Sequence, residues 1–246
     1  MSKTVNAAQG LEDRLAKHFD MEYSKDAREE RVSNFLKLEL ERAYLPNLKG
    51  GKALDIGCGC GANAFFIAGT GIFSSVDGID LSAVDIKKAK GRAAAKKSAK
   101  LNFSVGSFMG ARLDGNYSLI FASNVLEYVA PDKKKAFVDK MMESTKPGGI
   151  NIICFATSLP KDFVERLLEY PQSVGSKLPI KLFEGSEHER ALSLDFESGL
   201  LDLYRKSGWR VIKANRHEGE RNFVGIQMET IIVQKPLTEE LSAKRD

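Results

Sequence analysis

The chain has few cysteines, no long apolar run and no strong excess of charge. Its three cysteines, Cys58, Cys60 and Cys154, are too few and too unevenly spaced for a disulfide framework or a zinc site. No segment approaches the length that spans a membrane, and residues 1–10 lack the apolar centre of a signal peptide. A net charge of +4 selects no class of partner. We therefore expect a cytoplasmic protein that binds no metal and contacts no membrane.

Two common phosphate-binding motifs are also missing. A phosphate loop needs Gly-x-x-x-x-Gly-Lys-Ser/Thr, and the chain contains no such run. The dinucleotide fingerprint Gly-x-Gly-x-x-Gly begins at Gly57 but fails, because residue 62 is alanine. The glycine-rich turn of this chain therefore calls for a different ligand.

That turn follows a short apolar run over residues 52–56, which predicts a buried parallel strand. Glycines at alternate positions from 57 to 61 allow a sharp bend and a close approach of a ligand to the backbone. A helical pattern follows from Ala64, and the first N–H groups of such a helix favour a carboxylate or phosphate. Asp55 would repel a pyrophosphate but suits a cationic amino group. We expect the ligand at the carboxyl end of this strand.

A second acid lies at the end of the next expected strand, residues 75–80. Asp80 can accept hydrogen bonds from both hydroxyls of a ribose, whereas Asp77 lies in mid-strand. Ser82 and Asp85 have the spacing of a helix capping box, so a helix is expected from Ser82 to about residue 100.

This helix carries a basic stripe at every fourth position: Lys88, Arg92, Lys96 and Lys100. Such a stripe could follow a nucleic-acid backbone. It contains no interleaved aromatic residue for stacking on bases, so we favour a solvated outer face of an α/β domain and do not expect a nucleic-acid partner.

The run Asp55-x-Gly57-x-Gly59-x-Gly61 resembles the first motif of the class I S-adenosylmethionine-dependent methyltransferases. Further likenesses follow in the order of that family: an expected strand at 117–123 that leads into Asn124, and the Lys-Pro-Gly-Gly turn at 146–149 before an apolar strand at 150–155. Residues 124–127 do not match the Asp/Asn-Pro-Pro-Tyr/Phe sequence of enzymes that methylate base amino groups, which disfavours base methylation. Together the matches cover about residues 52–156.

The resemblance implies an α/β fold with a Rossmann-like, doubly wound sheet of seven strands, mostly parallel with an antiparallel closing strand. We expect one methyltransferase domain over 1–246. Its expected parts are an N-terminal helical segment at 1–50, a cofactor-binding core at 51–156, a lid or acceptor insertion at 157–196, and a closing helix and strands at 197–236. The remaining expected elements are a strand at 101–105, helices at 132–145 and 197–207, and strands at 209–213 and 228–235.

The same resemblance implies S-adenosyl-L-methionine as cofactor, with S-adenosyl-L-homocysteine as product. In this family an acid that contacts adenine often follows the third strand, but here Ser107 takes that place and Phe108 is available to lie against the ring. The residues expected to hold the cofactor are Asp55, Gly57, Cys58, Gly59, Gly61, Asn63, Asp80, Leu81, Ser107, Phe108, Asn124 and Tyr23.

Within the family the chain is most similar to the tellurite-resistance (TehB-type) methyltransferases. The likeness covers residues 145–153, 182–185, 208–209 and 230–236. That group places a His-Arg pair before its closing strand, whereas this chain has the order Arg216-His217, with Arg221 further on. The expected catalytic residues are His217, Arg216, Arg221 and Tyr128.

The implied reaction is an in-line displacement that requires alignment of the acceptor and exclusion of water, and needs no metal. Arginine and histidine would favour an anionic acceptor such as a chalcogen oxyanion or a thiolate. An amine or hydroxyl acceptor would need a base, for which His217, Glu127 and Tyr128 are candidates.

We therefore expect a small-molecule methyltransferase that is a monomer or homodimer. The alternatives are a methyltransferase acting on RNA or protein, and a non-catalytic module that binds the cofactor.

Overall fold

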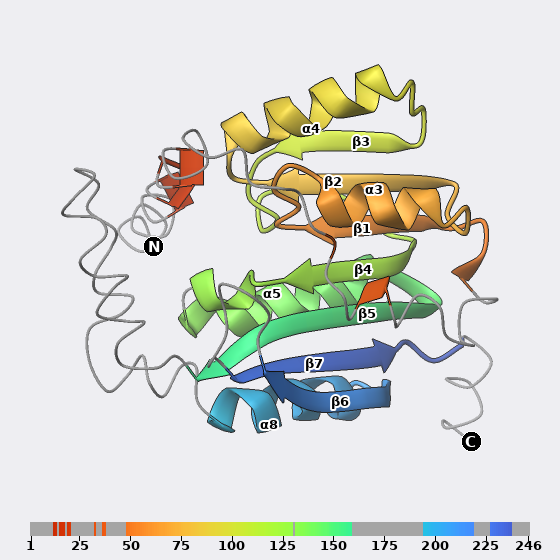
Figure 1. The fold of residues 1–246 in the computed structure, drawn as a ribbon. Coiled ribbons are helices and arrows are strands. Elements are labelled where there is room, and N and C mark those ends of the chain that lie inside the picture. The colour runs from red at the N-terminus through yellow and green to blue at the C-terminus, as the bar shows by residue number, and fades with distance from the viewer. Residues whose placement is uncertain are drawn as a thin grey trace.

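The computed structural model describes residues 12, 13, 15–17, 19, 20, 32, 36, 37, 48–129, 131–158, 194–218 and 227–237. Within these residues the fold is a seven-stranded sheet with helices on both faces (Figure 1). The described part of the chain contains no helix that is long and apolar enough to cross a membrane.

The strand order is β3-β2-β1-β4-β5-β7-β6. Strands β1 to β5 are parallel to one another, whereas β7 runs antiparallel to both β5 and β6. The predicted fold, including the antiparallel closing strand, is confirmed. The strands are β1 (Lys52–Ile56), β2 (Ser75–Asp80), β3 (Leu101–Val105), β4 (Tyr117–Ser123), β5 (Thr145–Ser158), β6 (Arg210–Glu218) and β7 (Gln227–Gln234).

The chain order places a switch point beside β1. After β1 the chain moves outward to β2 and β3, and it then returns to the other side of β1 with β4. In open sheets of this kind, ligands bind at the carboxyl ends of the strands where the direction of winding reverses. The glycine turn therefore lies at the position where a ligand is expected.

Four described helices complete the layers, with α3 and α4 on one face of the sheet and α5 and α8 on the other. A short 3₁₀ helix, η2, follows β4. The helices are α3 (Ala62–Gly69), α4 (Ala83–Ala95), η2 (Leu126–Tyr128), α5 (Pro131–Ser144) and α8 (Leu194–Lys206).

Each face of the sheet packs its own core. Alternate residues of the central strands point to opposite faces, so Leu119 and Phe121 of β4 pack under α3 and α4, while Ile120 and Ala122 pack under α5 and α8. All four side chains are at most 1% exposed. Burial on both faces explains why the sequence of β4 is nearly continuously apolar rather than alternating.

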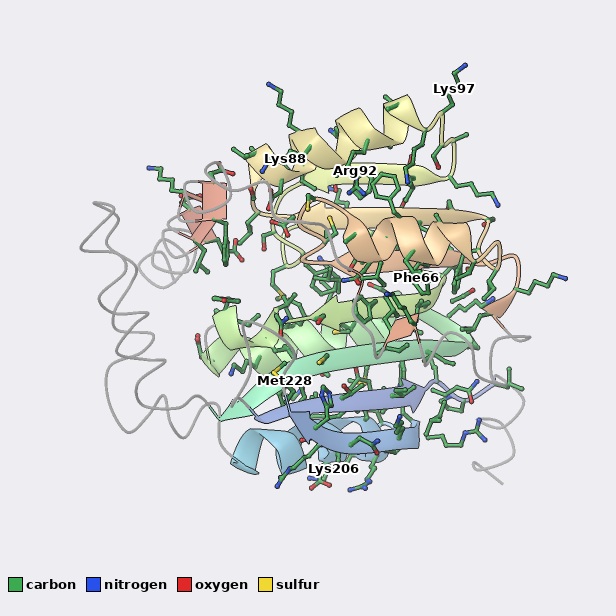
Figure 2. The ribbon with its side chains drawn as sticks, viewed as in Figure 1. Phe66, Lys88, Arg92, Lys97, Lys206 and Met228 are labelled. Carbon is green, nitrogen blue, oxygen red and sulfur yellow. The ribbon has the colours of Figure 1, made fainter. Side chains whose placement is uncertain are left out.

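The expected bounds of β1, β2, β3 and β4 agree with the structure, but the helix after β2 is shorter than expected. It ends at Ala95 rather than near residue 100, because Lys97 adopts a left-handed conformation (φ 49°). The N–H groups of Lys97 and Ser98 then donate to Ala94 and Ala93, which is a Schellman ending. Lys97 lies beyond the last turn of α4 (Figure 2).

Strand β5 is longer than expected and includes the Lys-Pro-Gly-Gly turn as an irregularity. Tyr117 pairs with Thr145 and Leu119 pairs with Ile150, so residues 146–149 bulge out of the ladder. Gly148 is left-handed there, with φ 73°. The expected break is thus a bulge within the strand.

The described residues of the N-terminal segment include helical residues, as expected, and those at 12, 13, 15–17, 19 and 20 lie at the carboxyl edge of the sheet (Figure 1). Leu15 and Leu36 are buried. Most of the expected lid, residues 159–193, lies outside the described residues.

Candidate cofactor-binding site

The glycine turn after β1 needs left-handed backbone at three positions. Gly57, Gly59 and Gly61 have φ angles of 67°, 51° and 92°. The N–H groups of Gly57 and Cys58 both donate to the carbonyl of Ile79, at 2.8 and 3.2 Å, which holds the turn against β2. The turn is thus tied to the neighbouring strand.

The three glycines differ in the space around them. A Cβ at Gly57 would lie 2.4 Å from Val125 Cγ2, and one at Gly61 would lie 2.8 Å from Phe103 Cζ. A Cβ at Gly59 would have Asp85 Oδ2 as its nearest neighbour, at 3.8 Å. Protein packing therefore requires glycine at 57 and 61, whereas at 59 the space is open to a ligand.

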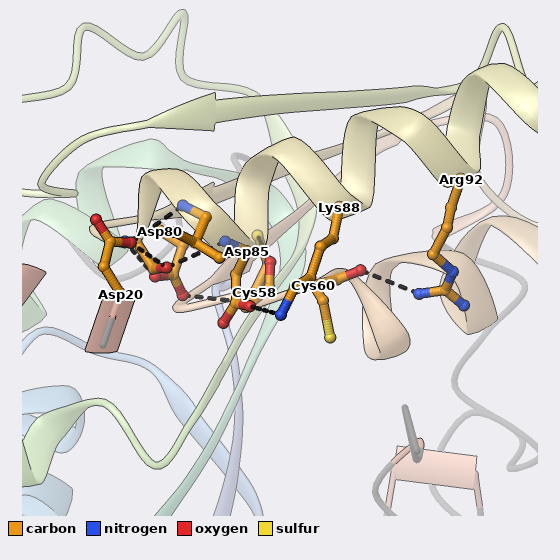
Figure 3. A network of polar contacts seen from close by, with 10 residues as sticks. Asp20, Cys58, Cys60, Asp80, Asp85, Lys88 and Arg92 are labelled. Atoms are coloured by element: carbon orange, nitrogen blue, oxygen red, sulfur yellow. Dashed lines mark hydrogen bonds and ion pairs between the residues drawn. The ribbon is translucent and has the colours of Figure 1, made fainter. Parts of the chain in front are cut away.

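Asp80, at the end of β2, faces this turn. Its Oδ2 accepts a hydrogen bond from the Gly59 N–H and its Oδ1 accepts one from the Ser82 N–H, both at 2.8 Å (Figure 3). Burial raises the pKa of Asp80, and these two N–H donors oppose the rise. The backbone of the glycine turn and the backbone that follows β2 therefore orient this carboxylate together.

Asp55 is the most buried carboxylate of the site, with a side chain that is 1% exposed. Its Oδ2 has no hydrogen-bond partner among the described residues. Burial, followed by the charge of Asp80, raises the pKa of Asp55 to about 8, and a hydrogen bond from the Ala64 N–H works in the opposite direction. Asp55 therefore accepts one of the N–H groups at the amino end of α3. Fewer of these donors are left for a ligand than the sequence suggested.

Asn124 presents a second buried oxygen on the neighbouring strand. It follows β4 in a left-handed conformation (φ 55°), which asparagine tolerates better than most residues. Its N–H donates to the Cys154 carbonyl at 3.0 Å, while its Oδ1 lacks a partner among the residues the structure describes. Because β1 and β4 are paired, Asp55 and Asn124 form an acceptor pair that calls for a ligand carrying N–H donors.

The raised pKa of Asp55 predicts a pH-dependent stability. The folded protein holds a proton on Asp55 up to about pH 8, whereas the unfolded chain releases it near its ordinary value of 3.8. The stability that Asp55 contributes is therefore complete below pH 4 and is lost as the pH rises through 8. Between these pH values the free energy of unfolding of the wild-type protein should fall by up to about 1.4 kcal/mol per pH unit. The variant Asp55→Asn should not show this fall, because asparagine does not ionise.

Urea unfolding of both proteins at pH 5 and pH 8, without added ligand, measures this effect. The wild-type protein should lose more stability between the two pH values than the variant does. Equal losses would mean that the folded state does not raise the pKa of Asp55.

At the end of β3 the structure changes the role of Phe108. This side chain is 4% exposed, and its ring centroid lies 4.7 Å from that of Phe137. Lys140 Nζ lies over the Phe108 ring, 5.2 Å from its centroid. Phe108 therefore belongs to the core in this structure and does not offer an open ring face. Ser107 remains half-buried at the edge, and its hydroxyl donates to Glu12 Oε1 at 2.6 Å.

The other expected cofactor residues lie around the turn. Cys58 is buried against Gly78: a Cβ on Gly78 would lie 2.9 Å from Cys58 Sγ. The space here is tight, which agrees with the interpretation of Cys58 as a small spacer. Asn63 lies on the first turn of α3, and Leu81 directly follows Asp80; both are half-buried. Tyr23 lies outside the described residues.

Three members of the basic stripe, Lys88, Lys96 and Lys100, are exposed as expected, whereas Arg92 is half-buried. Arg92 donates to the Cys60 carbonyl at 3.0 Å, and its guanidinium lies 4.4 Å from the Phe65 ring centroid. Lys96 lies over the same ring and Lys88 contacts Asp85 (Figure 3 shows Lys88 and Arg92 facing the turn). The expected fourth member, Lys100, lies beyond α4. Arg92 therefore joins α4 to the glycine turn and to Phe65 of α3.

The expected catalytic residues are separated along the carboxyl edge. Tyr128 ends η2, the short helix after β4, and its ring packs edge-on against that of Phe19, with the ring centroids 5.2 Å apart. Arg216 and His217 lie near the end of β6, where the His217 Nε2 is 2.9 Å from Thr230 Oγ1. Arg221 lies outside the described residues, as does the side chain of Glu127.

From the N-terminal segment the sequence suggested only Tyr23 as a cofactor residue, and it missed Glu12 and Asp20. Asp20 accepts hydrogen bonds from Ser82 Oγ at 2.7 Å and from the Val84 N–H at 3.0 Å. Glu12 contacts Ser107 in a similar way. Their charges resembled an ordinary solvated helix, and no local pattern links them to strand ends more than 60 residues away. Among the described residues, no group of three or more His, Cys, Asp or Glu could hold a metal ion.

Parts of the sequence and the fold are similar to those of known proteins. Residues 53–149 match the model of a family described as a methyltransferase domain. Hemagglutinin 1 of Eikenella corrodens is 32% identical over 109 residues, which are 43% of this chain and 34% of that protein. The carboxy-S-adenosyl-L-methionine synthase of Campylobacter fetus subsp. fetus (strain 82-40) is 26% identical over 162 residues, 66% of this chain and 62% of that protein. The chain thus spans about a third and about three fifths of these relatives.

A solved structure of similar fold is magnesium protoporphyrin IX methyltransferase (ChlM) from Synechocystis PCC 6803 with bound SAH. It superposes with a TM-score of 0.62 at 16% identity, covering 91% of this chain and 99% of that one. This likeness concerns the fold alone. Taken together, residues 53–149 match the model of the methyltransferase domain, and the sheet has the Rossmann-like topology of a solved methyltransferase structure.

Proposed function

We propose that this protein is an S-adenosylmethionine-dependent methyltransferase that acts on a small-molecule acceptor. The observation that carries the proposal is the pair of buried oxygens, Asp55 Oδ2 and Asn124 Oδ1, which have no partner among the described residues. Asp55 lies on β1, and Asn124 directly follows β4, the strand that pairs with β1. A ligand with a cationic amino group would satisfy both.

The other residues of the site fit the remaining parts of this cofactor. Asp80, at the end of β2, has the position from which an acid binds ribose hydroxyls in nucleotide-binding folds. Gly59 lets the backbone approach the ligand without a side chain in between. The charge of Asp55 in the bound state would complement an ammonium group, because a neighbouring cation favours the ionised carboxylate.

The bound cofactor would supply a methyl group already activated by the positive sulfur. The task of this chain is then to align the acceptor and to exclude water. Among the described residues Tyr128 is the better-placed candidate for contact with the acceptor, since it lies on η2, in the segment that follows β4 and Asn124. Its packing on Phe19 closes this end of the edge from the N-terminal side.

Arg216 and His217 are more distant candidates. From β4 to β6 the order passes β5 and β7, which is three strand spacings or about 14 Å. A direct role therefore requires an acceptor, or a segment outside the described residues, that extends across these strands. If His217 acts as a base, His217→Gln should lower kcat and flatten the pH–rate profile, with little change in cofactor affinity.

The class of acceptor is the finer part of the proposal. The likeness to the tellurite-resistance type favours a chalcogen oxyanion or a thiol, and an amine or hydroxyl of a metabolite is the other option. Support for a small molecule comes from the absence of the base-methylating motif and from the packing of Arg92 and Lys96 on Phe65 rather than along a free basic stripe.

Two measurements test the proposal. Calorimetry should detect binding of S-adenosylmethionine and S-adenosylhomocysteine, and mass spectrometry should detect a methylated product with selenite, tellurite, thiols, amines or phenols. Failure to bind either cofactor form would refute the proposal. Methylation of RNA or protein alone, or formation of a carboxylated cofactor, would replace the proposed reaction with another.

A further inference from the structure

The position of the cofactor base follows from the order of the strands along the edge. The acceptor pair of Asp55 and Asn124 lies at β1 and β4, and Asp80 lies at the end of β2. If Asp55 and Asn124 hold the amino group of the cofactor and Asp80 holds its ribose, the adenine must lie further along the edge in the same direction. The next strand is β3. This step rests on the proposed function.

The end of β3 offers space but carries no charge of its own. Gly106 has a φ of 153°, and a Cβ added to it would have no heavy atom within 4 Å. The three residues that follow are Ser107, Phe108 and Met109, so the strand end provides no carboxylate for the base. Ser107 stands where the family resemblance implies an acid.

The structure brings a carboxylate to this position from a different part of the chain. The Ser107 hydroxyl donates to Glu12 Oε1 at 2.6 Å, although the two residues are 95 positions apart in the sequence. The same hydroxyl oxygen accepts the Met109 N–H at 3.2 Å, which orients Ser107. Oε2 of Glu12 has no hydrogen-bond partner among the described residues and remains available as an acceptor.

The N-terminal helical residues hold Glu12 in place at several points. Leu15 is 2% exposed, Asp20 accepts hydrogen bonds from Ser82 Oγ and the Val84 N–H, and Phe19 packs on Tyr128. These contacts reach residues that follow β2 and β4, and the described helical residues lie beside the carboxyl edge of the sheet (Figure 1). Glu12 is therefore positioned by tertiary packing.

We propose that Glu12 is a cofactor-binding residue whose carboxylate, oriented by Ser107, accepts a hydrogen bond from the exocyclic amino group of the adenine. Adenine carries a donor at its 6-position, and a carboxylate is the strongest acceptor that a protein can place there. Glu12 thereby makes the site selective for 6-aminopurines, in place of the acid that is missing after β3.

The experiment compares S-adenosylhomocysteine with its analogue that carries hydrogen in place of the 6-amino group. Calorimetry should show that the wild-type protein prefers the amino form by about tenfold or more, the size expected for a hydrogen bond to a charged group. Glu12→Ala should weaken binding of the amino form by a similar factor and leave the two ligands bound about equally. A purely structural role of Glu12 would weaken both ligands alike and preserve their ratio.

Three further variants sharpen the test. Asp13→Ala removes an exposed carboxylate from the adjacent position and should leave both affinities unchanged. Glu12→Gln keeps the shape of the side chain and should reduce the preference, because the charge is lost. Adding Ser107→Asp to Glu12→Ala should restore the preference by placing the acid on the strand end.

The outcomes separate this inference from the proposed function. If the wild-type protein binds neither ligand, the proposed function fails and the inference fails with it. If the wild-type protein binds both and Glu12→Ala retains the full preference for the amino form, only the assignment of Glu12 is overturned.

Discussion

Asp80→Ala is expected to weaken binding of S-adenosylhomocysteine by tenfold or more. The variant removes the acceptor that we assign to the ribose hydroxyls, and hydrogen bonds to a charged group contribute about 1.5–3 kcal/mol. A factor of ten in affinity corresponds to about 1.4 kcal/mol, so loss of this interaction should be plain in a calorimetric titration.

Asp80 also has a structural role, which the experiment must separate from binding. Its carboxylate accepts the N–H groups of Gly59 and Ser82, so alanine leaves both donors without this partner. Asp80→Asn keeps the shape and one oxygen, and it should retain more of the turn while still losing the charge. We expect its affinity to lie between those of the wild-type protein and Asp80→Ala.

A matched control lies three residues earlier in the same strand. Asp77 accepts hydrogen bonds from the Tyr117 hydroxyl at 2.8 Å and from Asn102 Nδ2 at 2.9 Å, away from the carboxyl edge. Asp77→Asn should lower the stability of the fold and leave the affinity for S-adenosylhomocysteine unchanged. If Asp80→Ala binds as tightly as the wild-type protein, Asp80 is not the ribose ligand.

Gly57→Ala should mainly lower the stability of the fold, whereas Gly59→Ala should mainly lower the affinity for the cofactor. Gly57→Ala would place its Cβ 2.4 Å from Val125 Cγ2 in a left-handed conformation. Left-handed backbone costs a non-glycine residue about 1–2 kcal/mol and overpacking about 1–3 kcal/mol, so we expect a loss of about 2–5 kcal/mol in the free energy of unfolding. The defect should be visible in urea unfolding without any ligand.

Gly59→Ala should instead impair binding more than folding. Its Cβ would meet no protein atom closer than 3.8 Å, so the stability loss should stay near the 1–2 kcal/mol of the left-handed conformation alone. The added methyl group would occupy the space that we assign to the cofactor, and affinity should fall by at least tenfold. Wild-type affinity in Gly59→Ala would show that the ligand does not approach this part of the turn.

Much of the fold was predictable because its signals are local. The bounds of β1 to β4 agree with expectation: β1 and β4 are mostly apolar, β2 and β3 alternate apolar with polar residues, and each ends at or just before a glycine, an acid or an asparagine. The capping of α4 by Ser82 was also expected from spacing, and the Ser82 hydroxyl accepts the Asp85 N–H at 3.1 Å. Buried strands and helix caps depend on neighbouring residues, so the sequence reveals them directly.

Other expectations failed where local patterns were ambiguous. Phe108 was expected to be open to a ligand, but it packs on Phe137 from α5. Arg92 was read as part of a solvated stripe, but it binds the Cys60 carbonyl and covers Phe65. A charged residue at helical spacing looks the same in sequence whether its side chain reaches water or a neighbouring helix.

By itself, then, the sequence determined the glycine turn, the order of strands and helices, and the acids at the ends of β1 and β2. Only the tertiary structure decided that Glu12 and Asp20 meet the ends of β3 and β2, and that Asp55 and Asn124 share one edge. The physical reason is that turns and strands are set by interactions between near neighbours in the chain. Contacts between residues 60 to 95 positions apart exist only after the layers have packed against one another.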